Sequence, residues 1–392
     1  MSNDLPPVQT WSAGTTAVAP SAAQPVPQTA SEMLRLGWSQ PPGLVGLSVK
    51  NFLLRIVTLG IYHFWGKTEV RQRIWSGIRI NGEPLHYTGT GREMLLGFLF
   101  VLGVVAVPTF LVSLLVAIAF GSDSMAMAVF QGLIYVPFLL LIGVGIHRAT
   151  RYRLSRTRWR GIRGGLEGSA WHYGWTYFWT VVVLVLSLGW ASPWRSVKLQ
   201  GLITNDMRFG DRPFGFAATA GPLYGRFAVL WVSGLVILLV VIAGLMAGQF
   251  YMVVLGTEML GSGGQMKPEM LILSVLLLYA SVIVGFLLYS LVSAWYRAHM
   301  MNHFAAHTTF EGARFKGTAT GGSLVWITFS NYLMVLFTLG LLSPVAQARA
   351  ARYFVERLQI EGSASLADIL QRAEDQASRG EGLAQAFDID AF

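Results

Sequence analysis

The chain has 392 residues, of which 53% are hydrophobic and only 12% are charged. Soluble domains carry about 25% charged residues, so this composition excludes a disordered protein, a coiled coil and an ordinary soluble enzyme, and it indicates a polytopic membrane protein. Cysteine is absent, which excludes disulfides, thiolate metal sites and cysteine nucleophiles. The net charge of +9 is typical of the basic cytoplasmic loops of a membrane protein, so we expect no nucleic-acid partner.

The two ends of the chain differ in composition from its middle. Residues 1–32 are rich in Pro, Ala, Ser, Thr and Gln, which indicates a disordered N-terminal tail. Residues 361–392 are polar and acidic and are expected to form a C-terminal tail, with a short surface helix over 366–377.

Four long stretches are free of charged residues, and each exceeds the ~20 residues that a helix needs to cross the hydrocarbon core of a membrane. They form two pairs, each joined by a short polar loop: 94–120 with 125–146, and 227–257 with 270–296.

Three other apolar stretches, 43–65, 171–194 and 323–345, contain a break that begins with Leu-Gly. We call them the motif segments. The break residues are Gly60 with Trp65, Gly189 with Pro193 and Trp194, and Gly340 with Pro344.

Basic residues crowd into most loops, whereas the two loops inside the pairs hold only Lys267. The positive-inside rule therefore places those two loops outside, and all other loops and both termini in the cytoplasm. A motif segment then has cytoplasmic flanks at both ends, which a single crossing helix cannot have. We favour four crossings with three bent or half-inserted motif segments. Seven crossings are the alternative, because about 23 residues can also span.

The motif segments recur within larger units. The segment 157–163 is similar to 308–314, and Gly161 precedes Gly312 by the same 151 residues that separate Gly189 from Gly340. Two motifs with one offset indicate a duplication. We infer two repeat units, 33–170 and 171–322, and a truncated third unit, 323–360.

Short segments around a glycine alternate apolar and polar residues, as in 80–87, 209–216 and 310–315. Alternation across a Gly turn predicts β-hairpins, and isolated hairpins are marginal in water. The expected fold class is therefore an all-α polytopic membrane protein of pseudo-repeated helical units with a small cytoplasmic β-hairpin layer.

This arrangement resembles the YjgN-like family of bacterial inner-membrane proteins, whose function is unknown. The resemblance covers roughly residues 33 to 360 and implies a multi-pass protein of the bacterial inner membrane. It supplies no catalytic residues, and it implies a membrane peptidase as a possible partner. It rests on these residues of the motif segments: Asn51, Leu59, Gly60, Trp65, Leu188, Gly189, Pro193, Trp194, Leu339, Gly340 and Pro344.

Four polar residues inside the motif segments are candidates for a substrate or lipid pathway: Lys50, Asn51, Arg55 and Asn331. Charge within an apolar segment is costly and indicates a functional site. In the alternative interpretation, the two cations reach out to the membrane interface and the two asparagines bond one segment to another.

Two further clusters are candidate sites. On a helix, His299, His303 and His307 would share one face, as the ligands of a divalent metal would; a polar interfacial helix is the alternative. A run of arginines indicates a surface for anionic lipids or a partner, or only a determinant of topology. These arginines are Arg148, Arg151, Arg153, Arg156, Arg158, Arg160 and Arg163.

The sequence holds no P-loop, HExxH, GxSxG or kinase signature, so we expect neither an enzyme nor a cofactor. Two functional classes remain. The first is a transporter, channel or lipid-handling protein with a cavity between repeats. The second is a scaffold or regulator that binds a partner membrane protein through a basic cytoplasmic face.

Overall fold

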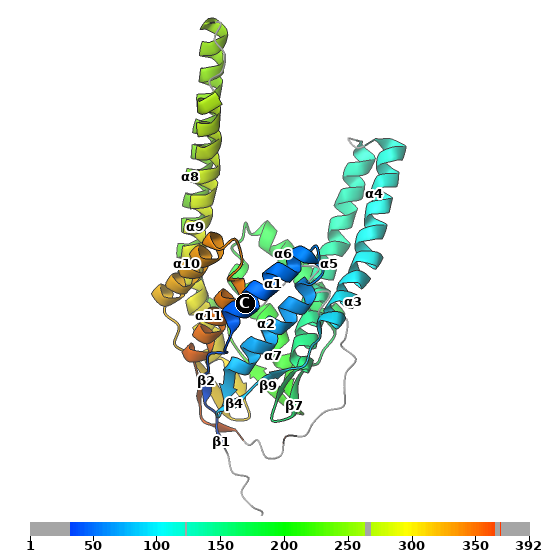
Figure 1. Cartoon of the computed structure of the whole chain (residues 1–392), viewed down its shortest axis with the longest axis vertical. Helices are drawn as coiled ribbons and strands as arrows, with labels where there is room; N and C mark the ends of the chain where they lie inside the picture. Colours follow the sequence, from blue (N-terminus) through cyan, green and yellow to red (C-terminus); the bar gives the residue numbers. More distant parts are fainter. Residues whose placement is uncertain (1–31, 122–123, 263–267, 365–368, 370–392) are drawn as a thin grey trace, which may run out of the picture.

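Two pairs of long helices rise from a smaller base in the computed structural model, which describes residues 32–121, 124–262, 268–364 and 369 (Figure 1). We call these pairs the first and second arm. The first arm consists of α3 (Gly91–Val101), the π-helical turn η1 (Leu102–Ala106), α4 (Val107–Phe120) and α5 (Met125–Arg156). The second arm consists of α8 (Gly221–Ser262) and α9 (Pro268–Ala306). Most of the two expected tails lies outside the described residues.

The arms contain the crossing helices expected from the sequence. Within the described residues, four helices are long and apolar enough to cross a membrane: Gly91–Phe120, Met125–Arg156, Gly221–Val254 and Ser274–Ala306. Each overlaps one predicted span, but its helix continues further at the base. The predicted spans end where charge begins, whereas the helices continue into the base through charged residues such as Arg148.

Each motif segment turns back on itself. The chain forms an apolar helix, reverses at the Leu-Gly pair, and returns to the base as a second helix. The three helical hairpins are α1 (Leu44–Val57) with α2 (His63–Gly77), α6 (Ala170–Leu186) with α7 (Ser192–Asp206), and α10 (Gly321–Phe337) with α11 (Ser343–Arg357). The apolar helices have 14, 17 and 17 residues, which is below the ~20 residues needed to span. The structure thus departs from the seven-crossing alternative.

The reversal is a Schellman-type helix end. Leu59 takes a left-handed conformation with φ 49°, and Gly60 follows with φ 92°. The amide of Gly60 donates to the carbonyl oxygen of Arg55 at 2.7 Å, and that of Leu59 donates to Ile56 at 3.2 Å. The pairs Leu188-Gly189 and Leu339-Gly340 have the same conformation, with φ near 50° and then 84–87°.

Side chains fix where these helices begin. The hydroxyl of Thr58 accepts a hydrogen bond from the amide of Tyr62 at 2.9 Å, and so holds the start of α2 against the turn. Pro193 and Pro344 stand in the first turn of α7 and α11, where the missing amide proton of proline costs nothing. The break that the sequence shows is therefore a helix end followed by a helix start.

Each helix that returns to the base leads into a strand, and the strands build three antiparallel sheets. The largest has eight strands in the order β12-β11-β10-β9-β8-β7-β6-β5, and the others have the orders β2-β3-β4 and β1-β13. The expected all-α class and small hairpin layer are therefore wrong in extent, because the separate hairpins join edge to edge. The strands are β1 (Glu32–Met33), β2 (Leu36–Trp38), β3 (Ile78–Ile80), β4 (Glu83–Pro84), β5 (His86–Tyr87), β6 (Thr157–Trp159), β7 (Ile162–Leu166), β8 (Met207–Phe209), β9 (Arg212–Phe216), β10 (Thr308–Phe310), β11 (Ala313–Gly317), β12 (Leu358–Glu361) and β13 (Ser363–Ala364).

The predicted hairpins themselves are confirmed. Antiparallel pairs form on either side of Gly82, Gly210 and Gly312. The turns at Asn81-Gly82 and Glu311-Gly312 each place two successive residues at positive φ, as a two-residue type I′ turn requires. Aromatic side chains cover the sheet: the rings of Phe214 and Phe310 stack with centroids 4.6 Å apart.

Candidate functional site

A groove of about 500 Å³ lies between α9, α10, α11 and one residue of α7. Its volume falls within the range of about 300–1,000 Å³ that is typical of small-molecule sites. The lining is mainly apolar and aromatic: Phe286, Tyr289, Ala294, Met300, Met301, Phe304, Leu324, Ile327, Tyr332, Ala350, Tyr353 and Phe354, with the polar residues Gln200, Ser290, Ser293, Arg297, Thr328 and Asn331.

The groove runs along one face of α9, within the helix Ser274–Ala306 that can cross a membrane. Its lining residues recur every three or four positions between Phe286 and Phe304, which is one face of a helix. This stretch is about 27 Å long at 1.5 Å per residue. Arg297 lies within the stretch, about 16 Å below Phe286 by the same measure, and its side chain is exposed.

Asn331 and its neighbours join α10 to α11 beside the groove. The Oδ1 atom of Asn331 is buried and has no hydrogen-bond partner among the described residues. The Nδ2 atom of Asn331 donates to the carbonyl oxygen of Ala346 at 3.2 Å. Arg349 donates to the hydroxyl of Ser330 at 2.9 Å and so ties α11 to α10 beside the groove.

Asn51 makes the same bond in the first hairpin. Its Nδ2 donates to the carbonyl oxygen of Gly66 at 3.2 Å, across 15 residues, which is also the separation of Asn331 from Ala346. Asn51 is 2% exposed and lines neither the groove nor the second pocket described below. The contacts thus give Asn51 a bond between two helices, as in the alternative interpretation of the sequence.

Lys50 forms an ion pair with Glu69, which lies in α2 after the turn of the first hairpin. Its Nζ lies 3.0 Å from Oε1 of Glu69, and the hydroxyl of Tyr62 donates to the same oxygen at 2.9 Å. The hydrogen bond with Glu69 raises the pKa of Lys50 above its ordinary value. The expected pathway residues are therefore separated: Asn331 lines the groove, Arg55 lines another pocket, and Lys50 and Asn51 line neither.

The tips of the three hairpins expose leucine. Leu59, Leu188 and Leu339 are 94%, 80% and 86% exposed, although a left-handed conformation costs a non-glycine residue about 1–2 kcal/mol. The second tip is anchored, because the indole Nε1 of Trp231 in α8 donates to the carbonyl oxygen of Leu188 at 2.9 Å. Since Trp231 belongs to a helix that can cross a membrane, the tip of this hairpin stands level with a membrane-spanning segment.

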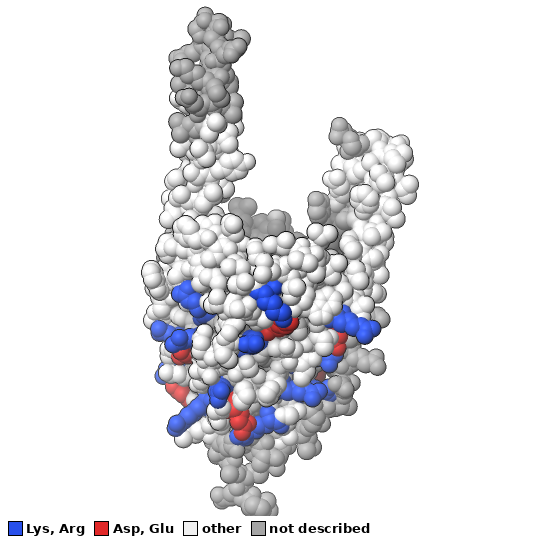
Figure 2. All heavy atoms as spheres, viewed as in Figure 1, with Lys and Arg blue, Asp and Glu red and all other residues white. Residues whose placement is uncertain are grey.

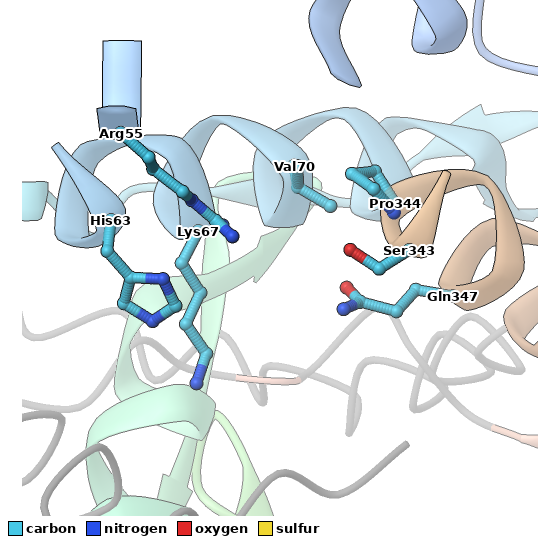
Figure 3. A pocket seen from close by; sticks show the side chains of 7 residues that line it. All are labelled: Arg55, His63, Lys67, Val70, Ser343, Pro344 and Gln347. Carbon is cyan, nitrogen blue, oxygen red and sulfur yellow. The ribbon is translucent and has the colours of Figure 1, made fainter. Parts of the chain in front are cut away.

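A second, smaller pocket of about 120 Å³ lies between the first and third hairpins. Figure 3 shows its lining residues, which are Arg55 from α1, His63, Lys67 and Val70 from α2, and Ser343, Pro344 and Gln347 from α11. The sequence indicated Arg55 as a candidate. The other polar lining residues were missed, since only folding brings α11 to α2.

The three histidines that were candidate metal ligands lie at the end of α9, the last of them directly after it, and contact backbone groups. In the described part of the chain, no group of three His, Cys, Asp or Glu side chains can hold a metal ion. The three imidazoles contact carbonyl oxygens instead: His299 that of Trp295 at 3.0 Å, His303 that of Thr219 at 2.8 Å, and His307 that of His303 at 2.8 Å. A shared helix face alone does not make a metal site, because each of the three rings contacts a backbone carbonyl oxygen.

Charged side chains gather on the base, whereas the described parts of the arms are white in Figure 2. Within the arginine run, several side chains stabilise the base itself. Arg156 pairs with Glu93 at 2.6 Å, and Arg160 pairs with Glu83 at 2.9 Å. Arg163 is 8% exposed, whereas Arg148 is exposed. The run is thus in part an internal network, which reduces the surface open to lipids or a partner.

Comparison with known proteins agrees with this architecture. Over 189 residues the chain is 25% identical to the inner membrane protein YjgN of Salmonella typhimurium (strain LT2), a match that covers 47% of this chain and only 45% of that protein. No solved structure matches the chain. The profile of one family, described as bacterial protein of unknown function (DUF898), matches residues 42–386 and confirms the resemblance seen in the motif segments. The chain therefore belongs to this family of bacterial proteins of unknown function.

Proposed function

We propose that the protein is a non-enzymatic, lipid-handling protein of the bacterial inner membrane, and that the groove along α9 holds one phospholipid. The observation that carries this proposal is the chemistry of the groove. The face of α9 in the groove is mainly apolar and aromatic from Phe286 to Phe304, and one exposed arginine, Arg297, stands among these residues. A phospholipid combines matching parts, because its acyl chains are apolar and its headgroup is anionic.

The placement in the membrane follows from the arms and the hairpins. Both arms cross, the basic base lies in the cytoplasm, and the three exposed leucine tips enter the cytoplasmic leaflet without crossing it. Exposed leucine is stable in lipid, which explains how a strained turn can carry it at all three tips. The common turn and the Asn bonds across 15 residues also support our view that the hairpins are copies of one unit.

The polar lining of the groove fits the binding and presentation of a lipid. It consists of amides, hydroxyls (those of Tyr289, Tyr332 and Tyr353 included) and one guanidinium. Hydrogen bonds from these groups can hold a headgroup.

A second candidate function is a scaffold for another membrane protein. The observation in its favour is that few side chains of the four crossing helices are buried inside the chain, so the arms leave apolar faces that a partner could cover. The inner membrane supplies lipid for the same faces, so we place this candidate second. A membrane peptidase remains the partner class implied by the family.

The test is native mass spectrometry of the protein released from nanodiscs. The nanodiscs contain phosphatidylethanolamine and phosphatidylglycerol, and the spectrum counts the phospholipids that stay bound. Thr328→Trp fills the groove from α10, and Arg297→Gln removes its cation. We expect the wild-type protein to retain one phospholipid, Thr328→Trp to lose it, and Arg297→Gln to lose mainly phosphatidylglycerol.

The matched control is Arg226→Gln. Arg226 is an exposed arginine at the base end of α8, in the same arm but outside the groove. Equal lipid retention by the wild-type protein and Thr328→Trp would contradict the proposal, and so would equal losses in Arg297→Gln and Arg226→Gln.

A further inference from the structure

The pocket between the first and third hairpins combines cations and hydrogen-bond donors without a carboxylate. Arg55 and Lys67 reach it from the first hairpin, and the hydroxyl of Ser343 and the amide of Gln347 reach it from the third (Figure 3). No Asp or Glu stands among the described lining residues. The nearest acidic partner on α2, Glu69, is already paired with Lys50.

Two helices of 15 residues begin at this pocket. His63 is the first residue of α2, and Ser343 is the first residue of α11, and both line it. The first turn of a helix carries a partial positive charge, so the dipoles of both helices favour an anion here. The dipoles act together with the two cationic side chains.

One buried donor of the Arg55 guanidinium has no hydrogen-bond acceptor among the described residues. This donor is the Nε atom. Burial lowers the pKa of Arg55 from its ordinary value, because a cation removed from water loses solvation energy. An anion in the pocket would offset that cost with charge-assisted hydrogen bonds.

The cations belong to the first hairpin alone. Arg55 precedes the turn glycine by five residues, and the residues at this place in the second and third hairpins are Leu184 and Val335. Lys67 follows the turn glycine by seven residues, where the other hairpins have Ser196 and Gln347. A hairpin of this type therefore forms without these charges. The two cations beside the pocket are therefore a feature of the first hairpin and not of the hairpin type.

We propose that this pocket binds a phosphate-type anion, held by Arg55, Lys67 and the starts of α2 and α11. The volume of about 120 Å³ is sufficient for a single phosphate group. Arg55 lies four residues below the tip leucine, which is about 6 Å along the helix. The phosphate can therefore be that of a lipid headgroup or free inorganic phosphate.

The experiment has one part for each source of phosphate. In the first part, the whole protein in neutral, phosphate-free detergent is titrated with inorganic phosphate in a calorimeter. In the second part, native mass spectrometry counts phosphatidylglycerol bound to protein taken from nanodiscs that contain mainly phosphatidylcholine. Every protein compared in this part also carries Thr328→Trp, so that lipid in the groove is not counted. Both parts of the experiment compare the wild-type protein with Arg55→Gln, Lys67→Gln and Arg55→Lys. Thermal unfolding without phosphate confirms that each variant is folded.

The matched control is Lys50→Gln, which removes one positive charge from the same helix α1 but outside the pocket. We expect Arg55→Gln and Lys67→Gln to weaken binding about tenfold or more, Arg55→Lys to lose less than Arg55→Gln, and Lys50→Gln to bind like the wild-type protein. Binding of inorganic phosphate identifies the free anion. Retention of phosphatidylglycerol alone identifies the headgroup, and both results support the site.

Two results would overturn the inference. One is that the wild-type protein binds neither ligand. The other is that Lys50→Gln loses as much binding as Arg55→Gln, since the effect would then reflect net charge only. Thr328→Trp fills the groove and should leave this binding unchanged, so a failure of the proposed lipid groove is separable from a failure of this site.

Discussion

The indole of Trp231 donates a hydrogen bond to the carbonyl oxygen of Leu188 at 2.9 Å. Trp190 packs edge-on against the same indole, with ring centroids 5.7 Å apart. The bond satisfies a carbonyl of a turn that reverses at the level of a membrane-spanning helix. An unsatisfied carbonyl in lipid costs several kcal/mol, so under the proposed placement in the membrane this contact stabilises the tip of the second hairpin.

Trp231→Phe keeps the ring and removes the donor. We expect the variant to lose about 1 kcal/mol of stability in detergent and more in nanodiscs, where no water replaces the lost bond. Thermal unfolding in both media measures the difference. Trp326→Phe, at a side chain 67% exposed on α10, is the control and should change neither value. A loss that is equal in the two media would argue against a tip buried in lipid.

The asparagine bonds hold two hairpins closed. Asn51→Ala and Asn331→Ala should each cost about 1–2 kcal/mol, because each removes a hydrogen bond that joins the two helices of a hairpin. Thr180 stands at the corresponding position of α6 and is buried, and its hydroxyl donates to the carbonyl oxygen of Tyr177 in the same helix, so Thr180→Ala should cost less. Denaturant titration of the purified variants gives the three values. The prediction fails if Thr180→Ala is as destabilising as Asn51→Ala.

Gly60 is required in the turn because its backbone has a positive φ, and not because a side chain there would meet other atoms. A Cβ atom at Gly60 would meet no atom within 4 Å, but φ there is +92°, so Gly60→Ala should cost about 1–2 kcal/mol from backbone strain alone. Gly46 in α1 also has open space and no positive φ. Gly46→Ala should therefore stabilise the protein by about 0.5–1 kcal/mol. Thermal unfolding of this pair of variants should show opposite signs, and equal signs would refute the explanation.

The sheet depends on a buried aromatic cluster at the base. Phe310 is 4% exposed and stacks on Phe214. Phe310→Ala should cost about 3–5 kcal/mol, the usual range for removing a buried phenylalanine. Phe337→Ala changes a side chain 81% exposed beside the third tip, and it should be near neutral in detergent. Urea denaturation of both variants tests this, and a small effect at Phe310 would mean that the sheet contributes little to stability.

Much of the membrane part could be predicted from the sequence. Charge-free runs determine the crossing helices, and Leu-Gly with a following Pro marks a helix end and a helix start. The eight-stranded sheet could not be predicted, because its pairings join distant segments, such as Thr308 with Phe216. A local alternation of apolar and polar residues predicts that a hairpin forms. It does not predict which other hairpin pairs with its edge strand.

The candidate site could be predicted only in part, for the same reason. Asn331 and Arg55 were candidates and line cavities, but the residues opposite them come from other hairpins. Lys50 looked like a charge in an apolar segment because its partner, Glu69, follows the turn. The histidine pattern gave a shared face but no information about the carbonyl oxygens that the rings meet.

The most direct test of our account is the side of the membrane from which each hairpin helix can be labelled. The chain has no cysteine, so single cysteines at His172 in α6, Lys198 in α7 and Met125 at the far end of the first arm can each be labelled with an impermeant maleimide; all three positions are exposed. We predict that His172→Cys and Lys198→Cys react only in inverted vesicles and that Met125→Cys reacts only in spheroplasts. Labelling of His172→Cys and Lys198→Cys from opposite sides would contradict a hairpin that enters the membrane and returns.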